Sequence, residues 1–207
     1  MRNIWVAGLV MLLAGILSAQ AKHEWSFSGG LLFPWGDLGK HFDSAMLWDI
    51  SYTGNSADPG RMVWAFKYLS KEWKYYDHDD EYGDTRGTTR ISYYVFAPSY
   101  RYELCGRNNI CPFFNIGPNV AYMYEYDKHE HYIANPGKWY PGAYHGSAIT
   151  LGWQGGAGVK FKIQPAYAIS LEYQYIQSLH VGDVETDAAT PNDLQGSTIM
   201  VGFVLRY

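Results

Sequence analysis

The chain has 207 residues, a length typical of one domain, and its formal net charge of -4 with a pI near 5.9 gives no reason to expect nucleic acid as a partner. Aromatic residues make up 17% of the chain, with 19 Tyr and 8 Trp, which is more than a soluble globular domain ordinarily needs. The mean hydropathy of -0.26 excludes a bundle of membrane helices but not a membrane barrel, because the interior and loops of a barrel are polar.

The N-terminus has the order of a secretory signal peptide. Residues 1–3 form a short positive region, residues 4–17 carry no charge, and an Ala-Gln-Ala sequence ends at Ala21. A membrane-anchoring helix is the alternative, but a helix needs about 20 apolar residues to cross the hydrocarbon. We therefore expect a cleaved segment at residues 1–21 and a mature domain at residues 22–207.

The mature chain alternates between apolar and polar residues with the period of a β-strand. In the clearest segment, from Ala148 to Ile163, one face carries Ile149, Leu151 and Trp153, and the other carries small or polar residues. This segment is long for a soluble strand, whereas a tilted strand that crosses a membrane needs about 9–11 residues. Six further segments have apolar faces of the same kind: Trp25, Phe27, Leu31 and Phe33; Trp48, Ile50 and Tyr52; Met62, Trp64, Phe66 and Tyr68; Phe114, Ile116, Val120, Tyr122 and Tyr124; Ile169, Leu171, Tyr173 and Tyr175; Ile199, Val201, Phe203, Leu205 and Tyr207.

An eighth strand is expected near residues 90–102, where both faces carry aromatic residues. We assign Tyr94, Phe96, Tyr100 and Tyr102 to the outer face so that Arg101 faces the interior. Eight is an even number, as a single-chain bacterial barrel requires to bring both ends of the chain to one side. The predicted fold class is therefore all-β, an eight-stranded antiparallel up-and-down transmembrane β-barrel.

The predicted connections alternate between long and short. The long ones are Pro34–Ala45, Ser70–Thr89, Asp127–Ser147 and His180–Gly196, and the short ones are Gly54–Gly60, Glu103–Cys111 and Gln164–Ala166. Outer-membrane barrels have long loops outside and short periplasmic turns. This pattern predicts that both termini lie in the periplasm.

Periodicity alone does not separate a membrane barrel from a soluble one, which places its apolar face inward. The charged residues of the alternating segments favour the membrane form, because an eight-stranded interior is just wide enough for side chains to fill. We expect a charge network in the lumen, formed by Asp49, Lys67, Lys160, Lys162 and Glu172. Aromatic residues such as Trp64, Tyr122, Tyr124, Trp153 and Tyr173 then belong to lipid-contacting belts rather than to a binding platform.

With these features, the chain resembles the OmpA/OmpX-type outer-membrane β-barrel families. Its last strand carries Phe203, Leu205 and a terminal Tyr207, which is similar to the signal that the barrel assembly machinery reads. The stretch from Phe33 to Leu38 also resembles barrels of this group. The resemblance implies an integral protein of the bacterial outer membrane, with lipid and lipopolysaccharide around it. It does not imply a ligand.

Cys105 and Cys111 flank a tight turn of five residues. In the oxidising periplasm we expect them to form a disulfide between the fourth and fifth strands. Free thiols are the alternative. A redox-active pair is disfavoured, because the C-x-x-C spacing is missing.

Two loops contain residue types that bind metals, but neither has the required pattern. The second long loop holds the acidic stretch Asp77–Asp84, but Tyr82 and Thr88 stand where an EF-hand loop that began at Asp77 would have its Gly and its bidentate Glu. His129, His131 and His145 lie in the third long loop, and the H-x-H pair is a weak metal signal. We expect no metal and no cofactor.

His145 and Ser147 suggest an enzymatic alternative, because some eight-stranded barrels hydrolyse lipid A with a His, Ser and acid set. The acid would have to orient the His, and Glu172 on the next strand should lie deeper than Ser147. We therefore expect no enzyme. The leading function is a structural or interaction barrel with a largely closed lumen, whose loops meet lipopolysaccharide, a host surface or another protein. A narrow porin-like channel or a carrier of small hydrophobic molecules is the first alternative, and a lipid-modifying enzyme is the second.

Overall fold

The computed structural model describes residues 23–36, 38–54, 60–79, 83–105, 109–133, 137–180 and 193–206. The expected signal segment 1–21 lies outside these residues. The strands are β1 (Glu24–Pro34), β2 (Ala45–Thr53), β3 (Gly60–Asp79), β4 (Gly83–Glu103), β5 (Ile110–Ile133), β6 (Lys138–Gln164), β7 (Tyr167–His180) and β8 (Leu194–Arg206), with one 3-10 helix, η1 (Leu38–Lys40).

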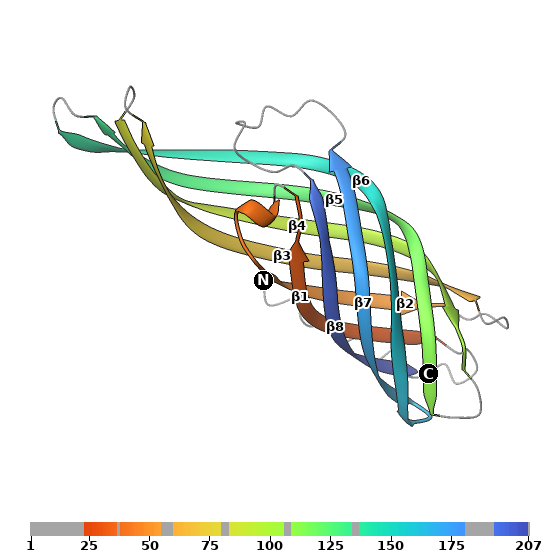
Figure 1. Cartoon of the computed structure of the whole chain (residues 1–207). Helices are drawn as coiled ribbons and strands as arrows, with labels where there is room; N and C mark the ends of the chain where they lie inside the picture. Colours follow the sequence, from red (N-terminus) through yellow and green to blue (C-terminus); the bar gives the residue numbers. More distant parts are fainter. Residues whose placement is uncertain are drawn as a thin grey trace, which may run out of the picture.

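The strands form a closed barrel in which each pairs with its neighbours in the sequence (Figure 1). All pairs are antiparallel, and β1 pairs with β8 to close the sheet, with Phe27 opposite Phe203. The predicted eight-stranded up-and-down barrel is thus confirmed. Within the described part of the chain, no helix has the length and apolar character needed to cross a membrane.

The alternating residues take the sides of the sheet that the sequence analysis assigned. Large apolar side chains point outward, and Phe66, for example, is 64% exposed. Their neighbours in the sequence point into the barrel, and both Asp49 and Lys67 are buried. In the fourth strand, Tyr94 and Tyr100 are exposed while Arg101 is buried, as predicted. The period of two therefore separates an apolar exterior from a mainly polar interior.

Four strands are longer than predicted. β3, β4, β5 and β6 have 20, 21, 24 and 27 residues, whereas the other four have 9 to 14. Most of the predicted loops 70–89 and 127–147 are instead paired strands, with Asp79 opposite Gly83 and Ile133 opposite Lys138. The prediction of long loops at these two places was wrong, because polar residues on both faces of a strand hide the apolar alternation that marks it.

The additional residues form a four-stranded sheet that stands beyond the closed barrel, visible in Figure 1 where β3 to β6 continue past the other strands. We call residues 70–79, 83–92, 124–133 and 138–147 the rim sheet. It begins at the row Ser70, Ser92, Tyr124 and Ser147, which are opposite one another in register. β2 pairs with β3 only up to Leu69, and β7 pairs with β6 only from Thr150, so the rim sheet has two edges without a paired strand among the described residues.

The opposite end of the barrel carries the short connections and the ends of the described chain. We call it the turn end. Glu24 of β1 is opposite Arg206 of β8 there, and the Arg206 amide donates to the carbonyl of Ala166 in the β6–β7 turn. At the rim end, the β1–β2 connection contains η1, which places the Leu38 side chain in a buried position.

Candidate functional site

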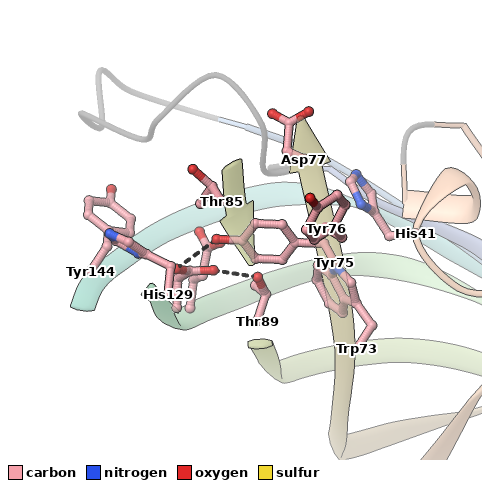
Figure 2. Close-up of a pocket in the computed structure, with 11 residues that line it drawn as sticks. His41, Trp73, Tyr75, Tyr76, Asp77, Thr85, Thr89, His129 and Tyr144 are labelled. Carbon is pink, nitrogen blue, oxygen red and sulfur yellow. Dashed lines mark hydrogen bonds and ion pairs between the residues drawn. The ribbon is translucent and has the colours of Figure 1, made fainter. Parts of the chain in front are cut away.

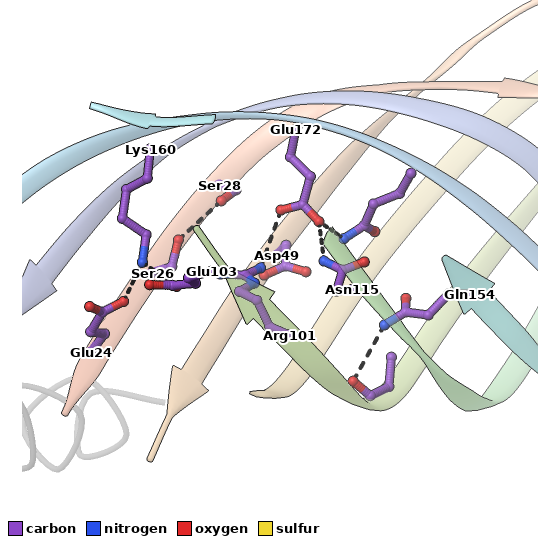
Figure 3. A network of polar contacts seen from close by, with 12 residues as sticks. Glu24, Ser26, Ser28, Asp49, Arg101, Glu103, Asn115, Gln154, Lys160 and Glu172 are labelled. Carbon is purple, nitrogen blue, oxygen red and sulfur yellow. Dashed lines mark hydrogen bonds and ion pairs between the residues drawn. The ribbon is translucent and has the colours of Figure 1, made fainter. Parts of the chain in front are cut away.

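Ion pairs fill the lumen at the turn end. The Lys160 ammonium, fully buried, lies 2.6 Å from both Glu24 and Glu103 (Figure 3). Glu24 also accepts from Arg206 at 2.7 Å and from Arg61 at 3.1 Å. Burial of a charge is tolerated only when it is paired and hydrogen-bonded, and this group meets both conditions.

A second charged layer lies further along the lumen. Lys67 donates to Asp49 at 2.8 Å and to Gln174 at 2.6 Å. Glu172 is 3.4 Å from Arg101 and also accepts from Asn115 and Gln174. The cavity between these residues measures about 10 Å³, which is room for about one water molecule.

Four of the five predicted lumen residues therefore belong to these layers: Asp49, Lys67, Lys160 and Glu172. Lys162 differs. Its side chain is only partly buried, and it makes no ion pair within 4.0 Å with any residue the structure describes. Lys162 follows Lys160 toward the turn end, where it lies opposite Ala168. It therefore contributes to the local field rather than to a paired contact.

Above the two charged layers, apolar side chains close the lumen, which the sequence analysis did not predict. Leu47 and Leu69 are opposite each other two residues beyond the Asp49–Lys67 pair. Their buried neighbours come from six other strands and from the η1 connection. We call this set the apolar cluster; its larger members are Leu32, Leu38, Phe42, Leu47, Leu69, Ile91, Tyr93, Val95, Met123, Ile176, Leu194 and Met200.

A pocket of about 460 Å³ opens above the apolar cluster, on the inner face of the rim sheet (Figure 2). We call it the rim pocket. Its lining residues are His41, Trp73, Tyr75, Tyr76, Asp77, Thr85, Thr89, Glu125, Asp127, His129 and Tyr144. A pocket of this volume is within the range that small-molecule sites occupy. Except for His41, all of these residues come from the rim sheet.

Asp127 is the centre of the hydrogen bonds in the rim pocket. It accepts from the Tyr75 hydroxyl at 3.2 Å and from the Thr89 hydroxyl at 2.6 Å, and His129 Nδ1 lies 2.7 Å away. Tyr75 reaches Asp127 across β4 because its cross-strand neighbour is Gly87; a Cβ there would lie 2.7 Å from the Tyr75 ring. Partial burial, together with the negative charge of Asp127, raises the pKa of Tyr75 to about 12.

These side chains were missed because they lie in the two segments assigned to loops. A signal was present: Trp73, Tyr75 and Asp77 alternate on β3, and Glu125, Asp127 and His129 alternate on β5. Because their partners on the opposite face are also polar, the alternation has no hydrophobic contrast. Which residues lie next to each other on neighbouring strands also depends on the register, and the register cannot be read directly from the sequence.

The candidate metal residues do not converge. His129 and His131 lie on the inner face, where His131 contacts the Thr85 hydroxyl at 2.9 Å, whereas His145 lies on the outer face against Tyr124. Among the described residues, no three His, Cys, Asp or Glu side chains could hold one ion. Of the acidic stretch 77–84, residues 80–82 lie outside the described residues.

The catalytic set considered from the sequence is also separated. His145 and Ser147 are exposed on the outer face of β6, while the Glu172 carboxylate is buried in the lumen. A Ser, His and acid set needs all three groups in one chain of hydrogen bonds. These three residues do not form one.

The two cysteines are joined. Cys105 and Cys111 form a disulfide across the β4–β5 turn, with the two Cα atoms 4.4 Å apart. Of the C-terminal residues assigned to the assembly signal, Phe203 is exposed on the outer face and Leu205 is partly exposed. Tyr207 lies outside the described residues.

Comparison with known proteins adds the family to this geometry. A profile of the outer membrane protein beta-barrel domain family matches residues 7–207. The chain belongs to this family. No curated protein sequence matches it. The family places the exposed aromatic and aliphatic side chains of the barrel, including Trp64, Tyr122, Trp153 and Tyr173, in the outer membrane of a bacterium.

Several solved structures of outer membrane proteins are similar to the chain at low sequence identity. OprG of Pseudomonas aeruginosa is similar with a TM-score of 0.52 and 12% identity, over 90% of this chain and 96% of OprG. Neisserial surface protein A has a TM-score of 0.49 and 14% identity, over 89% and 96%. The outer membrane enzyme PagL has a TM-score of 0.40 and 14% identity, over 89% and 99%. At 12% identity the similarity to OprG extends to the fold alone.

Proposed function

We propose that this member of the outer membrane protein beta-barrel domain family is a non-conducting interaction barrel. Its rim sheet would face the outside of the cell, and both termini would face the periplasm. The observation that carries the proposal is the filled lumen: two layers of charged residues and the apolar cluster lie in series between the two ends. An aqueous channel needs a continuous polar path, and the apolar cluster interrupts it.

The outer face of the rim sheet supports lipopolysaccharide as one interaction partner. Lys74, Thr88 and Lys128 lie opposite one another on three adjacent strands, and they line a hollow of about 330 Å³ together with the Arg86–Glu130 ion pair. Ammonium and hydroxyl groups in a row are suitable donors for phosphate oxygens. The row stands beyond the exposed rings of the barrel wall, on the side where headgroups would begin.

Planar-bilayer recording of the purified, folded protein tests the closed lumen. We expect no steady ohmic current, while a large porin measured in the same bilayers gives one. A steady current of appreciable size in this protein would overturn the proposal and favour the narrow-channel alternative.

Binding of purified lipopolysaccharide tests the outer face. The double variant Lys74→Gln/Lys128→Gln should lower the apparent affinity by about thirtyfold, because each of the two cations near an anionic surface contributes on the order of 1 kcal/mol. The control is Lys138→Gln, which removes an exposed lysine from the same sheet outside that row. Equal effects of the two changes would remove the assignment of the row as a phosphate site.

We propose no catalytic role, since the outward His145 and Ser147 are separated from the buried Glu172. Lipid A mass spectrometry with and without the protein tests this, and a change that Ser147→Ala abolishes would contradict it. We also propose that Phe203, Leu205 and Tyr207 act as the signal for the barrel assembly machinery during insertion. Their replacement should lower the amount of folded protein in the membrane.

A further inference from the structure

We propose that the rim pocket binds a small organic cation of the ammonium class, with its charge near Asp77 and Asp127 and its apolar part against Trp73 and Tyr75. This goes beyond the interaction role proposed above. It concerns the inner face of the rim sheet, above the apolar cluster, and does not depend on whether the lumen conducts.

The first observation is the charge of the pocket lining. Three carboxylates face the pocket, from Asp77, Glu125 and Asp127, and no Lys or Arg is among the described residues that line it. The nearest cation on the same face of β3 is Lys71, whose ammonium lies over the Phe42 ring at 5.7 Å. The lining therefore carries three carboxylates and two histidines, His41 and His129, and no permanent cation, which makes the pocket a region of negative potential.

The second observation is how Asp127 is held. Asp127 accepts from the hydroxyls of Tyr75 and Thr89, and His129 Nδ1 lies 2.7 Å away; none of these three partners carries a permanent charge, so they orient the carboxylate without a fixed cation beside it. Asp127, Asp77 and Glu125 all contribute to the raised pKa of Tyr75, after burial, which indicates that the three charges act at one place. A cation entering there gains from all three.

The third observation concerns what kind of cation fits. The described carboxylates and histidines do not gather closely enough to hold a metal ion. The pocket is also lined by the rings of Trp73, Tyr75 and Tyr144, and the Trp73 ring contacts those of His41 and Phe42, at centroid distances of 5.3 Å and 5.8 Å. Aromatic faces attract an ammonium group and also cover its alkyl carbons. An organic ammonium compound satisfies both the charge and the rings.

The experiment uses the full mature chain, folded in a non-ionic detergent, with choline and benzyltrimethylammonium as probes. Binding is measured by calorimetry and by saturation-transfer NMR. The neutral comparison is 3,3-dimethylbutan-1-ol, which has the shape of choline without its charge, and glucose tests whether the rings bind a sugar instead. We expect saturable binding of at least one cation, weakened by added salt, and at least about fivefold weaker binding of the alcohol.

Two variants assign the binding to the pocket. Asp77→Asn removes an exposed carboxylate without disturbing the Asp127 hydrogen bonds, and Trp73→Leu removes a ring; each should weaken binding about two- to fivefold. The matched control is Glu72→Gln, one residue before Trp73 on the outer face of the same strand, which should leave binding unchanged. A difference in gel mobility between heated and unheated samples verifies that each variant is folded.

Three results would overturn the proposal: no saturable binding of either cation, equal binding of the neutral alcohol, or equal effects of Asp77→Asn and Glu72→Gln. Binding of glucose alone would replace it with a sugar site. None of these results bears on the bilayer recording, so a failure of the pocket and a failure of the closed lumen are distinguishable.

Discussion

Each end of the lumen has a carboxylate at its centre, but the partners of the two carboxylates differ in charge. At the turn end, Glu24 is surrounded by the permanent cations of Lys160, Arg61 and Arg206. At the rim end, Asp127 is held by Tyr75, Thr89 and His129, none of which carries a permanent charge. The carboxylates at the turn end are matched by permanent cations, which close the barrel there, whereas Asp127 has no permanent cation beside it and keeps a charge that a ligand can meet.

The largest effect on the free energy of unfolding is expected at the turn end. Replacing Lys160 with Met removes the ammonium that pairs with the buried Glu103, whereas Glu24 keeps Arg61 and Arg206. Removing one partner of a buried ion pair costs about 3–5 kcal/mol, because the remaining charge keeps its desolvation penalty. The measurement is urea-induced unfolding of the protein in lipid vesicles, followed by gel mobility.

Arg86→Met is the control from the rim end. Arg86 pairs with Glu130 at 2.7 Å, but both side chains are about half exposed to solvent. Exposed ion pairs contribute about 1 kcal/mol or less. If the two substitutions cost the same, the charged layer at the turn end does not stabilise the barrel in the way described.

The sequence was sufficient to predict which charged residues face the lumen near the turn end, but it was not sufficient to predict the residues of the rim pocket. Asp49, Lys67, Lys160 and Glu172 were assigned to the lumen because each alternates with strongly apolar neighbours, and that contrast determines the face of a strand. Their pairing was not predictable in detail, since Lys160 meets Glu24 from a strand that is far away in the sequence.

The rim sheet gave no such contrast. Tyr75 and Asp127 are flanked by Lys74 and Lys128, so both faces of their strands are polar and both segments were assigned to loops. The apolar cluster was missed for the converse reason. Leu69 and Met123 face inward, but their neighbours in the sequence are large side chains that face outward. When both faces of a strand carry such residues, the sequence pattern does not indicate which face is buried.

Removal of the disulfide at the turn end is expected to have an intermediate effect on the free energy of unfolding. The change Cys105→Ala/Cys111→Ala opens a loop with a sequence separation of 6. In the chain-entropy account a loop of this size contributes about 2 kcal/mol, less than a long loop would. The same urea unfolding assay measures it, and the wild-type protein under reducing conditions should shift by a similar amount. No shift under either condition would mean that the β4–β5 turn is held by its strands alone.

The smallest effect is expected in the pH dependence of the free energy of unfolding, through Tyr75 of the rim pocket. The pKa of Tyr75 is raised from 10.0 to about 12 by partial burial and by the charges of Asp127, Asp77 and Glu125. Below pH 10 the phenol is protonated in both the folded and the unfolded chain, so its contribution to stability is fully present. Between the two values the unfolded chain loses this proton first, and the contribution is lost as pH rises through the folded pKa.

Tyr75→Phe has no such proton, so the free energy of unfolding of the wild type should fall more steeply than that of the variant between about pH 10 and pH 12. The difference should be about 1 kcal/mol or less, since Tyr75 is partly exposed and solvent screens its neighbours. Parallel curves would mean that the carboxylates of the rim pocket do not act on Tyr75. Because the same negative field is what an ammonium ligand would meet, a steeper wild-type curve that flattens when choline is added would connect the titration to the pocket directly.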